Sequence, residues 1–351
     1  MGEILGLGVT HFPGLTVPDE QMNGVLLRTL GSDRFPAELR DPARWPEPMR
    51  KEWGSDKGAT SAAEHRRRQV EAFRAVRKEL ERFTPDFVVI FGDDQYENFR
   101  EDMIPPFCIF AAPDLSSRPF ARKGVFTNQN VWSAGPETTI PVAGHPEGAK
   151  YLIAKLMDAG IDMTYAYTLR HDIGLAHAFI NTVMYLDWDR QGFPWPVVPF
   201  HVNCYGSSIV SKRGGIGHLK GEAGVPDPPG PSPARCFDIG AATARILAQS
   251  PYRVALIASS SWSHAFLTEK NQFLHCDIDS DRARFEELRN GRLDEWRKLT
   301  TAQIEDAGQQ ELLNWLCLAG AMHELGRKAE VVDWIETYIF NSSKCFAVFR
   351  P

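Results

Sequence analysis

The chain has 351 residues and a formal net charge of −6. This acidic balance lacks the basic footprint that nucleic-acid-binding proteins carry. Hydrophobic residues make up 43% of the chain and charged residues 24%, an ordinary composition for a soluble protein with a packed core. We therefore expect residues 1–351 to form a single globular domain with no nucleic-acid partner.

The cysteines and the N-terminus indicate where in the cell the protein is expected. The six cysteines are scattered and form no C-x-x-C pair, which fits a reducing environment better than a disulfide framework. The N-terminus has no basic segment and reaches His11 too early for the apolar core of a signal peptide. Because no apolar run is long enough to cross a membrane, the sequence predicts a cytoplasmic protein without a membrane span.

The N-terminal part of the chain alternates apolar runs with an amphipathic segment. Residues 4–9 are expected to form a short buried strand, and residues 17–60, rich in Pro, Arg, Asp and Trp, an irregular covering segment. The charged amphipathic pattern over 62–83 predicts a helix, and the apolar run over 87–91 predicts a buried strand. A helix followed by an apolar strand is typical of α/β proteins.

The rest of the chain continues this alternation. Helices are expected over 146–159 and 237–249 and through most of 279–325, strands over 163–168, 196–202 and 253–258, and a long loop over 206–235. A loop of that length is usually either functional or mobile. The predicted fold class is therefore α/β, a single domain whose central, mostly parallel or mixed sheet is flanked by helices.

Two histidines directly follow predicted strands. His11 precedes a Pro-Gly turn, and a rigidly placed imidazole at a sheet edge suits a metal ligand. His264 lies in a Ser-rich turn whose hydroxyls can fix its tautomer, so it is a candidate general acid/base. Each histidine alone is more often a hydrogen-bonded turn residue. Together they mark one rim of a parallel sheet, where open α/β sheets bind their ligands.

A polar, acidic cluster follows the strand over 87–91. It contains Asp93, Asp94, Gln95 and Glu97. Their oxygens are suitable ligands for a divalent cation. Asp is equally a favoured residue at the start of a helix, so capping is an alternative of similar weight.

Glu311 stands at the Gly-bounded start of a helix with an apolar pattern. The helix dipole stabilises a carboxylate there. Burial among Leu and Trp side chains would require a cation or a hydrogen-bond partner for the charge. The alternative is a surface glutamate in the first helical turn.

The segment from Arg170 to Phe179 places His171 and His177 at a predicted strand-to-helix junction, together with Asp172. Both histidines are candidates for a catalytic acid or a substrate contact. We expect one of the two to be structural.

In their order along the chain, these segments resemble the class III extradiol ring-cleavage dioxygenases of the protocatechuate 4,5-dioxygenase type. Residues 10–13 resemble the first iron-ligand segment of that family, and residues 85–107 resemble the second. Ser263-His264 resembles the segment of the catalytic histidine, and Glu311 resembles the carboxylate ligand. Against this family, residues 17–70 and about 206–228 look like insertions.

The resemblance implies a mononuclear Fe(II) centre with a facial set of two histidines and one carboxylate, which leaves positions open for substrate and O₂. The implied substrate is a small catechol-like or hydroxylated aromatic compound, and His264 is the implied base. Asp172 and Ser263 are expected to contact the substrate. The resemblance also implies a homodimer or a higher homo-oligomer.

The chain departs from the family at the second iron-ligating histidine, whose position is occupied by Gln95. An amide oxygen is a neutral and weaker donor than imidazole. If Asp94 turned inward instead, the site would hold two carboxylates with His11 and would favour harder cations. The predicted metal ligands are therefore His11 and Glu311, completed by Gln95 or Asp94.

A second departure concerns the histidine that contacts substrate or O₂ in the family, where this chain has Ile173. His177 or His171 would have to reach in from a neighbouring position. These departures keep two other functions open: a non-oxidative hydrolase or lyase on the same scaffold, with another metal or none, and a non-catalytic binding protein. The presence of both His11 and His264 argues against the non-catalytic alternative.

Overall fold

The computed structural model describes residues 2–122, 129–170, 174–208 and 225–351. Within these residues, eight strands form one mixed sheet with the order β4-β3-β5-β2-β6-β1-β8-β7. The strands are β1 (Glu3–Val9), β2 (Phe87–Gly92), β3 (Phe107–Phe110), β4 (Thr164–Ala166), β5 (Val197–Val202), β6 (Arg253–Ser259), β7 (Glu330–Ile335) and β8 (Lys344–Phe349). The central strands β5, β2, β6 and β1 are parallel, whereas β8 is antiparallel to β1, β7 is antiparallel to β8, and β3 is antiparallel to β5.

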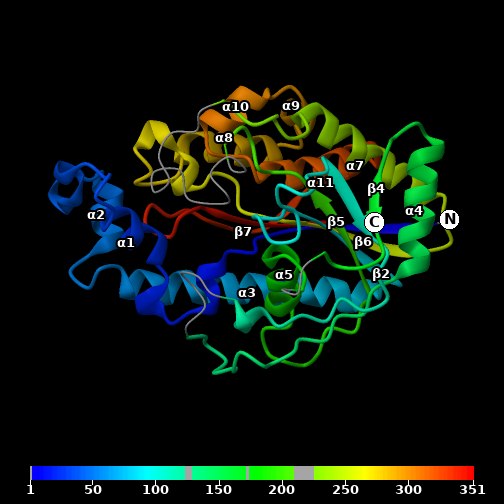
Figure 1. The fold of residues 1–351 in the computed structure, drawn as a ribbon, viewed down its shortest axis with the longest axis horizontal. Coiled ribbons are helices and arrows are strands. Elements are labelled where there is room, and N and C mark those ends of the chain that lie inside the picture. The colour runs from blue at the N-terminus through cyan, green and yellow to red at the C-terminus, as the bar shows by residue number, and fades with distance from the viewer. Residues whose placement is uncertain (1, 123–128, 171–173, 209–224) are drawn as a thin grey trace.

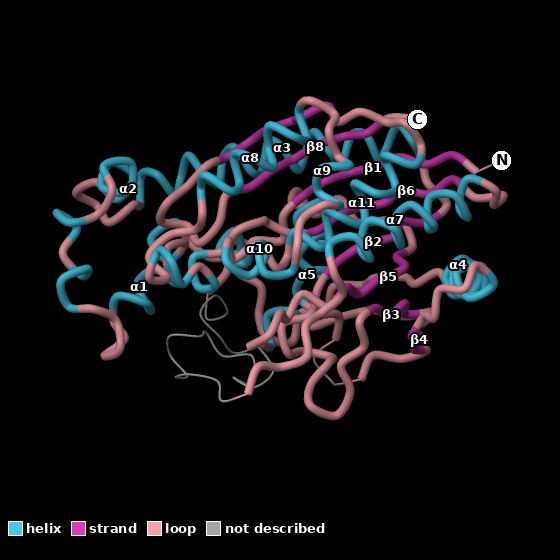
Figure 2. Tube along the Cα trace, turned by 90° about the horizontal axis from the view of Figure 1, so that it is seen from above, coloured by secondary structure: helices cyan, strands magenta, loops and turns pink. Residues whose placement is uncertain are grey.

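Helices cover both faces of the sheet (Figure 1). They are α1 (Gly24–Leu30), α2 (Glu47–Trp53), α3 (Ala59–Phe83), α4 (Pro146–Asp158), α5 (His177–Leu186), α7 (Pro233–Ala248), α8 (Ile278–Arg289), α9 (Asp294–Arg297), α10 (Thr301–Asp306) and α11 (Leu312–Glu324). Helices α3 and α5 lie against one face, and α7 and α11 lie against the other. Figure 2, seen from above, shows the strands side by side in a row from β4 to β8. The predicted α/β class, with a mixed sheet flanked by helices, is confirmed.

The central strands are buried on both faces, which explains why they read as continuous apolar runs. Successive side chains of a strand point to opposite faces. In β2, Phe87, Val89 and Phe91 join the core on the α7/α11 face. Val88 and Ile90 join the core on the α3/α5 face.

Helix α11 is buried along almost its whole length and crosses α7 at close range. Glycines make this approach possible, because an added Cβ at Gly320 would lie 1.9 Å from the carbonyl oxygen of Phe237. A Cβ at Gly240 would lie 1.8 Å from the carbonyl oxygen of Cys317. The tight crossing holds the N-terminus of α11 over the end of the central strands.

The structure differs from the sequence prediction in two places. Residues 17–60 are not irregular but contain α1, α2 and several 3₁₀ turns, and Figure 1 shows these helices at one end of the molecule. Strands β3, β7 and β8 were not predicted: β3 has only four residues, and β7 is a partly exposed edge strand with two acidic residues. None of the described helices is long and apolar enough to cross a membrane. All six cysteines are free and buried.

Candidate metal and catalytic site

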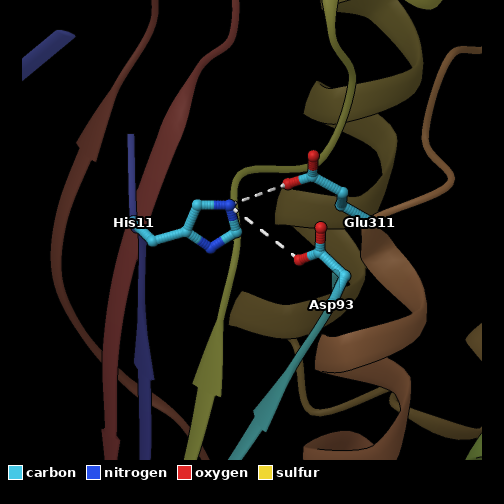
Figure 3. Close-up of side chains that lie close together, drawn as sticks. All are labelled: His11, Asp93 and Glu311. Carbon is cyan, nitrogen blue, oxygen red and sulfur yellow. Dashed lines mark ion pairs between the residues drawn. The ribbon is translucent and has the colours of Figure 1, made fainter. Parts of the chain in front are cut away.

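Buried polar side chains gather where the parallel strands end. His11 follows β1, Asp93 follows β2, and His264 follows β6, so the parallel arrangement brings the three to the same edge of the sheet. Glu311 directly precedes α11 and faces the same place (Figure 3). The exposed fractions of these four residues are 2%, 1%, 5% and 2%, respectively.

Glu311 stands between the two imidazoles. Its Oε2 lies 3.4 Å from Nε2 of His11 and 3.3 Å from Nε2 of His264. Oδ1 of Asp93 lies 3.9 Å from the same His11 nitrogen. In the described part of the chain, His11, Asp93 and Glu311 form a group whose ligand atoms all lie within 4.8 Å of one another.

A backbone carbonyl fixes each imidazole from its other side. Nδ1 of His11 lies 2.9 Å from the carbonyl oxygen of Ser259, and Nδ1 of His264 lies 3.1 Å from that of Trp262. A carbonyl only accepts a hydrogen bond, so Nδ1 carries the proton in both rings. In the neutral imidazole, Nε2 then presents its lone pair towards Glu311.

The loop before α11 is joined to the end of β6. The hydroxyl of Ser260 donates to the backbone oxygen of Glu311 at 2.8 Å, and the backbone N–H of His264 donates to the oxygen of Gly308 at 2.9 Å. Gly308 has a φ of 63°, and an added Cβ would lie 2.5 Å from Oγ1 of Thr268. A glycine at 308 therefore lets the loop hold the carboxylate and the imidazole at a fixed separation.

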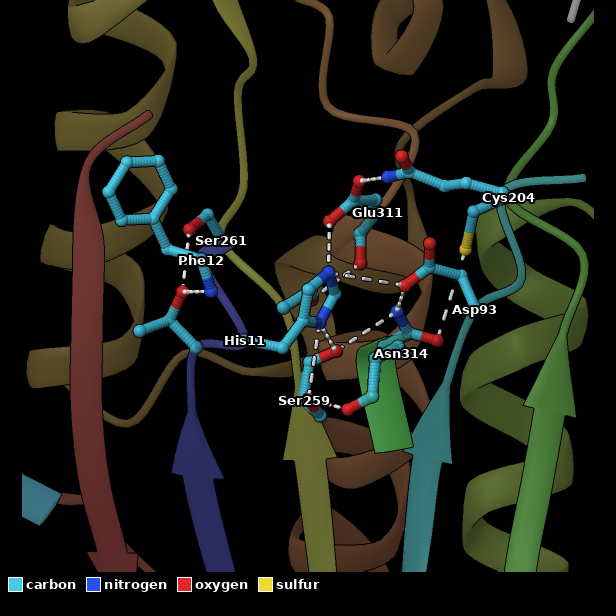
Figure 4. Close-up of polar contacts among 12 residues, drawn as sticks. His11, Phe12, Asp93, Cys204, Ser259, Ser261, Glu311 and Asn314 are labelled. Atoms are coloured by element: carbon cyan, nitrogen blue, oxygen red, sulfur yellow. Dashed lines mark hydrogen bonds and ion pairs between the residues drawn. The ribbon is translucent and has the colours of Figure 1, made fainter. Parts of the chain in front are cut away.

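Amide side chains hold the two carboxylates. Nδ2 of Asn314 donates to Oδ1 of Asp93 at 3.0 Å (Figure 4). Nε2 of Gln95 donates to Oε1 of Glu311 at 2.6 Å. Gln95, predicted from the sequence as a metal ligand, therefore lies beside the cluster as a hydrogen-bond donor to one of its carboxylates.

Asp94 does not turn into the cluster. Its carboxylate accepts hydrogen bonds at 2.7 Å from the backbone N–H groups of Glu97 and Asn98, and at 2.7 Å from the hydroxyl of Tyr205. Asp94 therefore binds backbone N–H groups, as the alternative of a capping residue predicted. The hypothesis that its carboxylate turns inward to a metal ion is corrected. The residue that faces His11 is its neighbour, Asp93.

His177 lies next to the cluster at the start of α5. Its ring is perpendicular to that of His11, with 4.9 Å between the centroids. Its Nδ1 lies 2.9 Å from Oε2 of Glu97, whose other oxygen pairs with Arg122 at 2.7 Å. Burial alone would raise the pKa of Glu97, but His177 and Arg122 lower this pKa to about 2. The structure therefore places His177, held by an ionised carboxylate, beside His11.

The other predicted substrate-side residues have different positions. His171 and Asp172 lie outside the described residues. Ser263 is fully buried; its hydroxyl donates to the oxygen of Ala307 at 2.6 Å and accepts from the N–H of Asp277 at 2.7 Å. In place of the expected substrate contact, Ser263 joins three backbone segments behind His264.

The pKa values at the cluster reflect burial and mutual charge. Burial alone would lower the pKa of His11, but the carboxylates of Asp93 and Glu311 raise it to about 9. Burial would raise the pKa of Glu311, but His264 and His11 lower it to about 2. Burial, followed by the charge of Glu311, raises the pKa of Asp93 to about 7. The cluster thus stabilises positive charge between two carboxylates.

Two carboxylate oxygens have no hydrogen-bond partner among the described residues, although they are buried: Oδ2 of Asp93 and Oε2 of Glu311. An unsatisfied buried oxygen is costly, and a bound cation would satisfy both. Together with Nε2 of His11, these donors fit a divalent metal ion. The sequence placed Asp93 in a polar cluster without singling it out, and it did not identify Asn314 or the link between Glu97 and His177.

Residues 227–348, which include His264 and Glu311, match the family described as the catalytic LigB subunit of aromatic ring-opening dioxygenases. This part of the chain is similar to the LigB-type ring-opening dioxygenases. It is 26% identical over 204 residues to the 2,3-dihydroxyphenylpropionate/2,3-dihydroxicinnamic acid 1,2-dioxygenase of Photorhabdus laumondii, covering 58% of this chain and 50% of that protein. It is 28% identical over 285 residues to the protein of the same name from Burkholderia vietnamiensis, covering 74% and 83% of the two chains.

The extent of these matches varies. This chain spans about half the length of the Photorhabdus laumondii relative, and 47% of the similarly named protein of Comamonas testosteroni. Among solved structures, an uncharacterized protein from Escherichia coli K12 is similar with a TM-score of 0.46 and 13% identity, over 80% of this chain and 91% of that one.

Proposed function

We propose that the protein is an extradiol-type dioxygenase that uses O₂ to open the ring of a small catechol-like or hydroxylated aromatic substrate. The observation that carries this proposal is the placement of one buried Glu311 oxygen 3.4 Å and 3.3 Å from the Nε2 atoms of His11 and His264. The match of residues 227–348 to the LigB subunits supports the same reaction class. The proposed cofactor is Fe(II).

His11 and Glu311 would hold the metal, with a third donor beside them. When bound, such an ion supplies positions for substrate and O₂ and a path for electrons between them. The surrounding protein keeps water away from the ligand atoms, because both residues are only 2% exposed.

His264 would move the protons of the reaction. Burial lowers its pKa, so the neutral imidazole is the resting form at neutral pH. Its Nε2 can accept the proton of a substrate hydroxyl, since the carbonyl of Trp262 holds the other ring nitrogen. His177 lies beside His11 and would contact the substrate, held in place by Glu97.

The activity can be tested directly. Metal-stripped protein is loaded anaerobically with Fe(II), and O₂ uptake is recorded with catechol, protocatechuate and 2,3-dihydroxyphenylpropionate. We expect uptake with at least one compound, accompanied by the absorbance of a ring-opened product. Protein that holds iron and takes up no O₂ with any of them would contradict ring opening. Substrate consumption without O₂ would favour the non-oxidative hydrolase or lyase.

Replacing the proposed base gives a sharper test. We expect His264→Gln to lower kcat by about 10²- to 10⁴-fold, the usual contribution of general acid/base catalysis, while the bound iron stays unchanged. His323→Gln is the matched control, because His323 is exposed near the end of α11. Undiminished turnover by His264→Gln would remove His264 from this role.

The oligomeric state is a separate part of the proposal. The family resemblance supports a homodimer or a higher homo-oligomer. Light scattering of the purified 351-residue chain would distinguish this assembly from a monomer of 39.4 kDa.

A further inference from the structure

We propose that Asp93 completes the metal site, so that the cation is held by one imidazole and two carboxylates: His11, Asp93 and Glu311. This inference rests on the proposed function only in using the same metal-binding site. It concerns the position at which the family resemblance implies a second histidine ligand and this chain has Gln95. Three neighbouring residues are candidates for the third metal ligand: Asp93, Asp94 and Gln95.

The contacts of Asp93 are those of a ligand. Its side chain is 1% exposed and lies 3.9 Å from Nε2 of His11. Asn314 binds Oδ1, whereas the buried Oδ2 has no hydrogen-bond partner among the described residues. Figure 3 shows the carboxyl groups of Asp93 and Glu311 both facing the imidazole of His11. The amide of Asn314 thus fixes the carboxylate while leaving one oxygen for a cation.

Gln95 has the contacts of a supporting residue. It is exposed, and its amide nitrogen donates to Oε1 of Glu311 at 2.6 Å. The opposite orientation of the amide would place its oxygen against an ionised carboxylate, which offers no proton to bond. Gln95 therefore orients Glu311 so that Oε2, the oxygen that Gln95 does not bind, faces the histidines.

Asp94 has no free oxygen to offer. Its carboxylate already accepts from two backbone N–H groups and from the hydroxyl of Tyr205. Turning it towards His11 would break all of these bonds and leave buried donors unsatisfied.

The donor set changes the charge of the site. Two carboxylates cancel the charge of a divalent cation, whereas one carboxylate with two imidazoles leaves a net positive charge. Oxygen-rich sets suit hard cations such as Mn²⁺, and two-histidine sets suit Fe²⁺. We therefore expect Mn²⁺ to bind with an affinity within about tenfold of that for Fe²⁺.

The test is the binding of Mn²⁺ to the metal-stripped protein. The EPR signal of free Mn²⁺ measures how much of the added ion remains unbound. Asp93→Asn is expected to weaken binding by more than about 100-fold, and Gln95→Leu by about tenfold, the usual effect of a residue that orients a ligand. Asp94→Asn is the matched comparison at the adjacent carboxylate and should change the affinity by less than about threefold. Thermal unfolding of each metal-free variant shows that it is folded.

Pulsed EPR of the Mn²⁺-loaded protein gives a readout independent of affinity. We expect coupling to the ¹⁴N of a single imidazole, which disappears in His11→Ala protein loaded at high Mn²⁺. Coupling to two imidazoles would overturn the inference. So would wild-type protein that binds no Mn²⁺, or Asp93→Asn protein that binds it as wild type does. Mn²⁺ bound as expected, with iron-loaded protein that takes up no O₂, would instead contradict only the proposed function.

Discussion

One carboxylate oxygen of Glu311 contacts both His11 and His264, but the two imidazoles have opposite electrostatic environments. Asp93 adds a second carboxylate beside His11, and the pKa of His11 is raised to about 9. At His264, burial outweighs the charge of Glu311 and lowers the pKa of the imidazole. Groups whose surroundings separate their pKa values in this way usually have different roles. This difference supports the proposed roles, cation binding by His11 and proton transfer by His264.

Glu97 is a positioning residue for His177, and its replacement gives a prediction. Its carboxylate accepts from the backbone N–H and from Nδ1 of His177 and pairs with Arg122. Glu97→Gln removes the charge that holds the imidazole. We expect kcat/KM for ring opening to fall about 10- to 100-fold, as is usual for groups that orient active-site histidines. Steady-state O₂ uptake measures the effect.

The matched control is Glu137→Gln, because Glu137 also pairs with an arginine, Arg118, but is 83% exposed. Its kcat/KM should stay at the wild-type value. Metal content should be unchanged in Glu97→Gln, since Glu97 does not belong to the group around His11. A loss of metal together with activity would mean that Glu97 supports the metal site and not His177.

At the level of elements, strand alternation distinguishes Asp93 from Asp94. Phe87, Val89 and Phe91 point to the α11 face of the sheet, and Asp93 continues this row one residue beyond β2. Asp94 belongs to the alternate row, and its carboxylate accepts a hydrogen bond from the backbone N–H of Asn98. The alternation of residues along β2 can be read from the sequence. It distinguishes Asp93 from Asp94 only when the face covered by α11 is known. The ends of β1, β2 and β6 could be predicted, and the helix that completes the site could not be placed.

The close crossing of α7 and α11 gives a prediction for stability. Gly320→Ala would place a methyl group 1.9 Å from the carbonyl oxygen of Phe237, so the two helices must move apart. We expect the free energy of unfolding to fall by about 1–3 kcal/mol, the usual cost of overpacking a core. Urea unfolding measures the change. Gly135→Ala is the control, because an added methyl group there meets nothing within 4 Å; equal midpoints for the two variants would contradict the tight crossing.

Across the whole molecule, the sequence predicted the parallel centre of the sheet and missed its edges. Strands β1, β2, β5 and β6 are apolar because helices cover both of their faces, and this burial is visible in the sequence. Strand β7 is partly exposed, and its partner β8 begins with a buried lysine, Lys344. The Nζ atom of Lys344 donates to the backbone oxygens of Phe340 and Ser342 in the turn just before β8, and these bonds satisfy the buried ammonium group. A charged residue at the start of a strand does not continue an apolar run, so the sequence pattern does not mark β8.

The stability of the folded chain should depend on pH through His201 in β5. His201 is 1% exposed, and 4.4 Å separate the centroids of its ring and the ring of Phe99. Burial lowers its pKa from 6.5 to about 3. The unfolded chain therefore binds this proton more readily than the folded chain. The contribution of neutral His201 to the free energy of unfolding is complete above pH 6.5 and is lost progressively as the pH falls towards 3.

Replacing His201 with phenylalanine isolates this contribution from those of other titrating groups. Protonation of His201 in the unfolded chain lowers the free energy of unfolding of the wild type by about 2 kcal/mol at pH 5 relative to pH 8. The free energy of unfolding should therefore fall by about 2 kcal/mol less in His201→Phe than in wild type between these pH values, measured by urea unfolding. His323→Phe, at an exposed position, should retain the full wild-type dependence. If His201→Phe and wild type lose the same free energy, the folded protein must accommodate a protonated His201, stabilised by the backbone of Pro105.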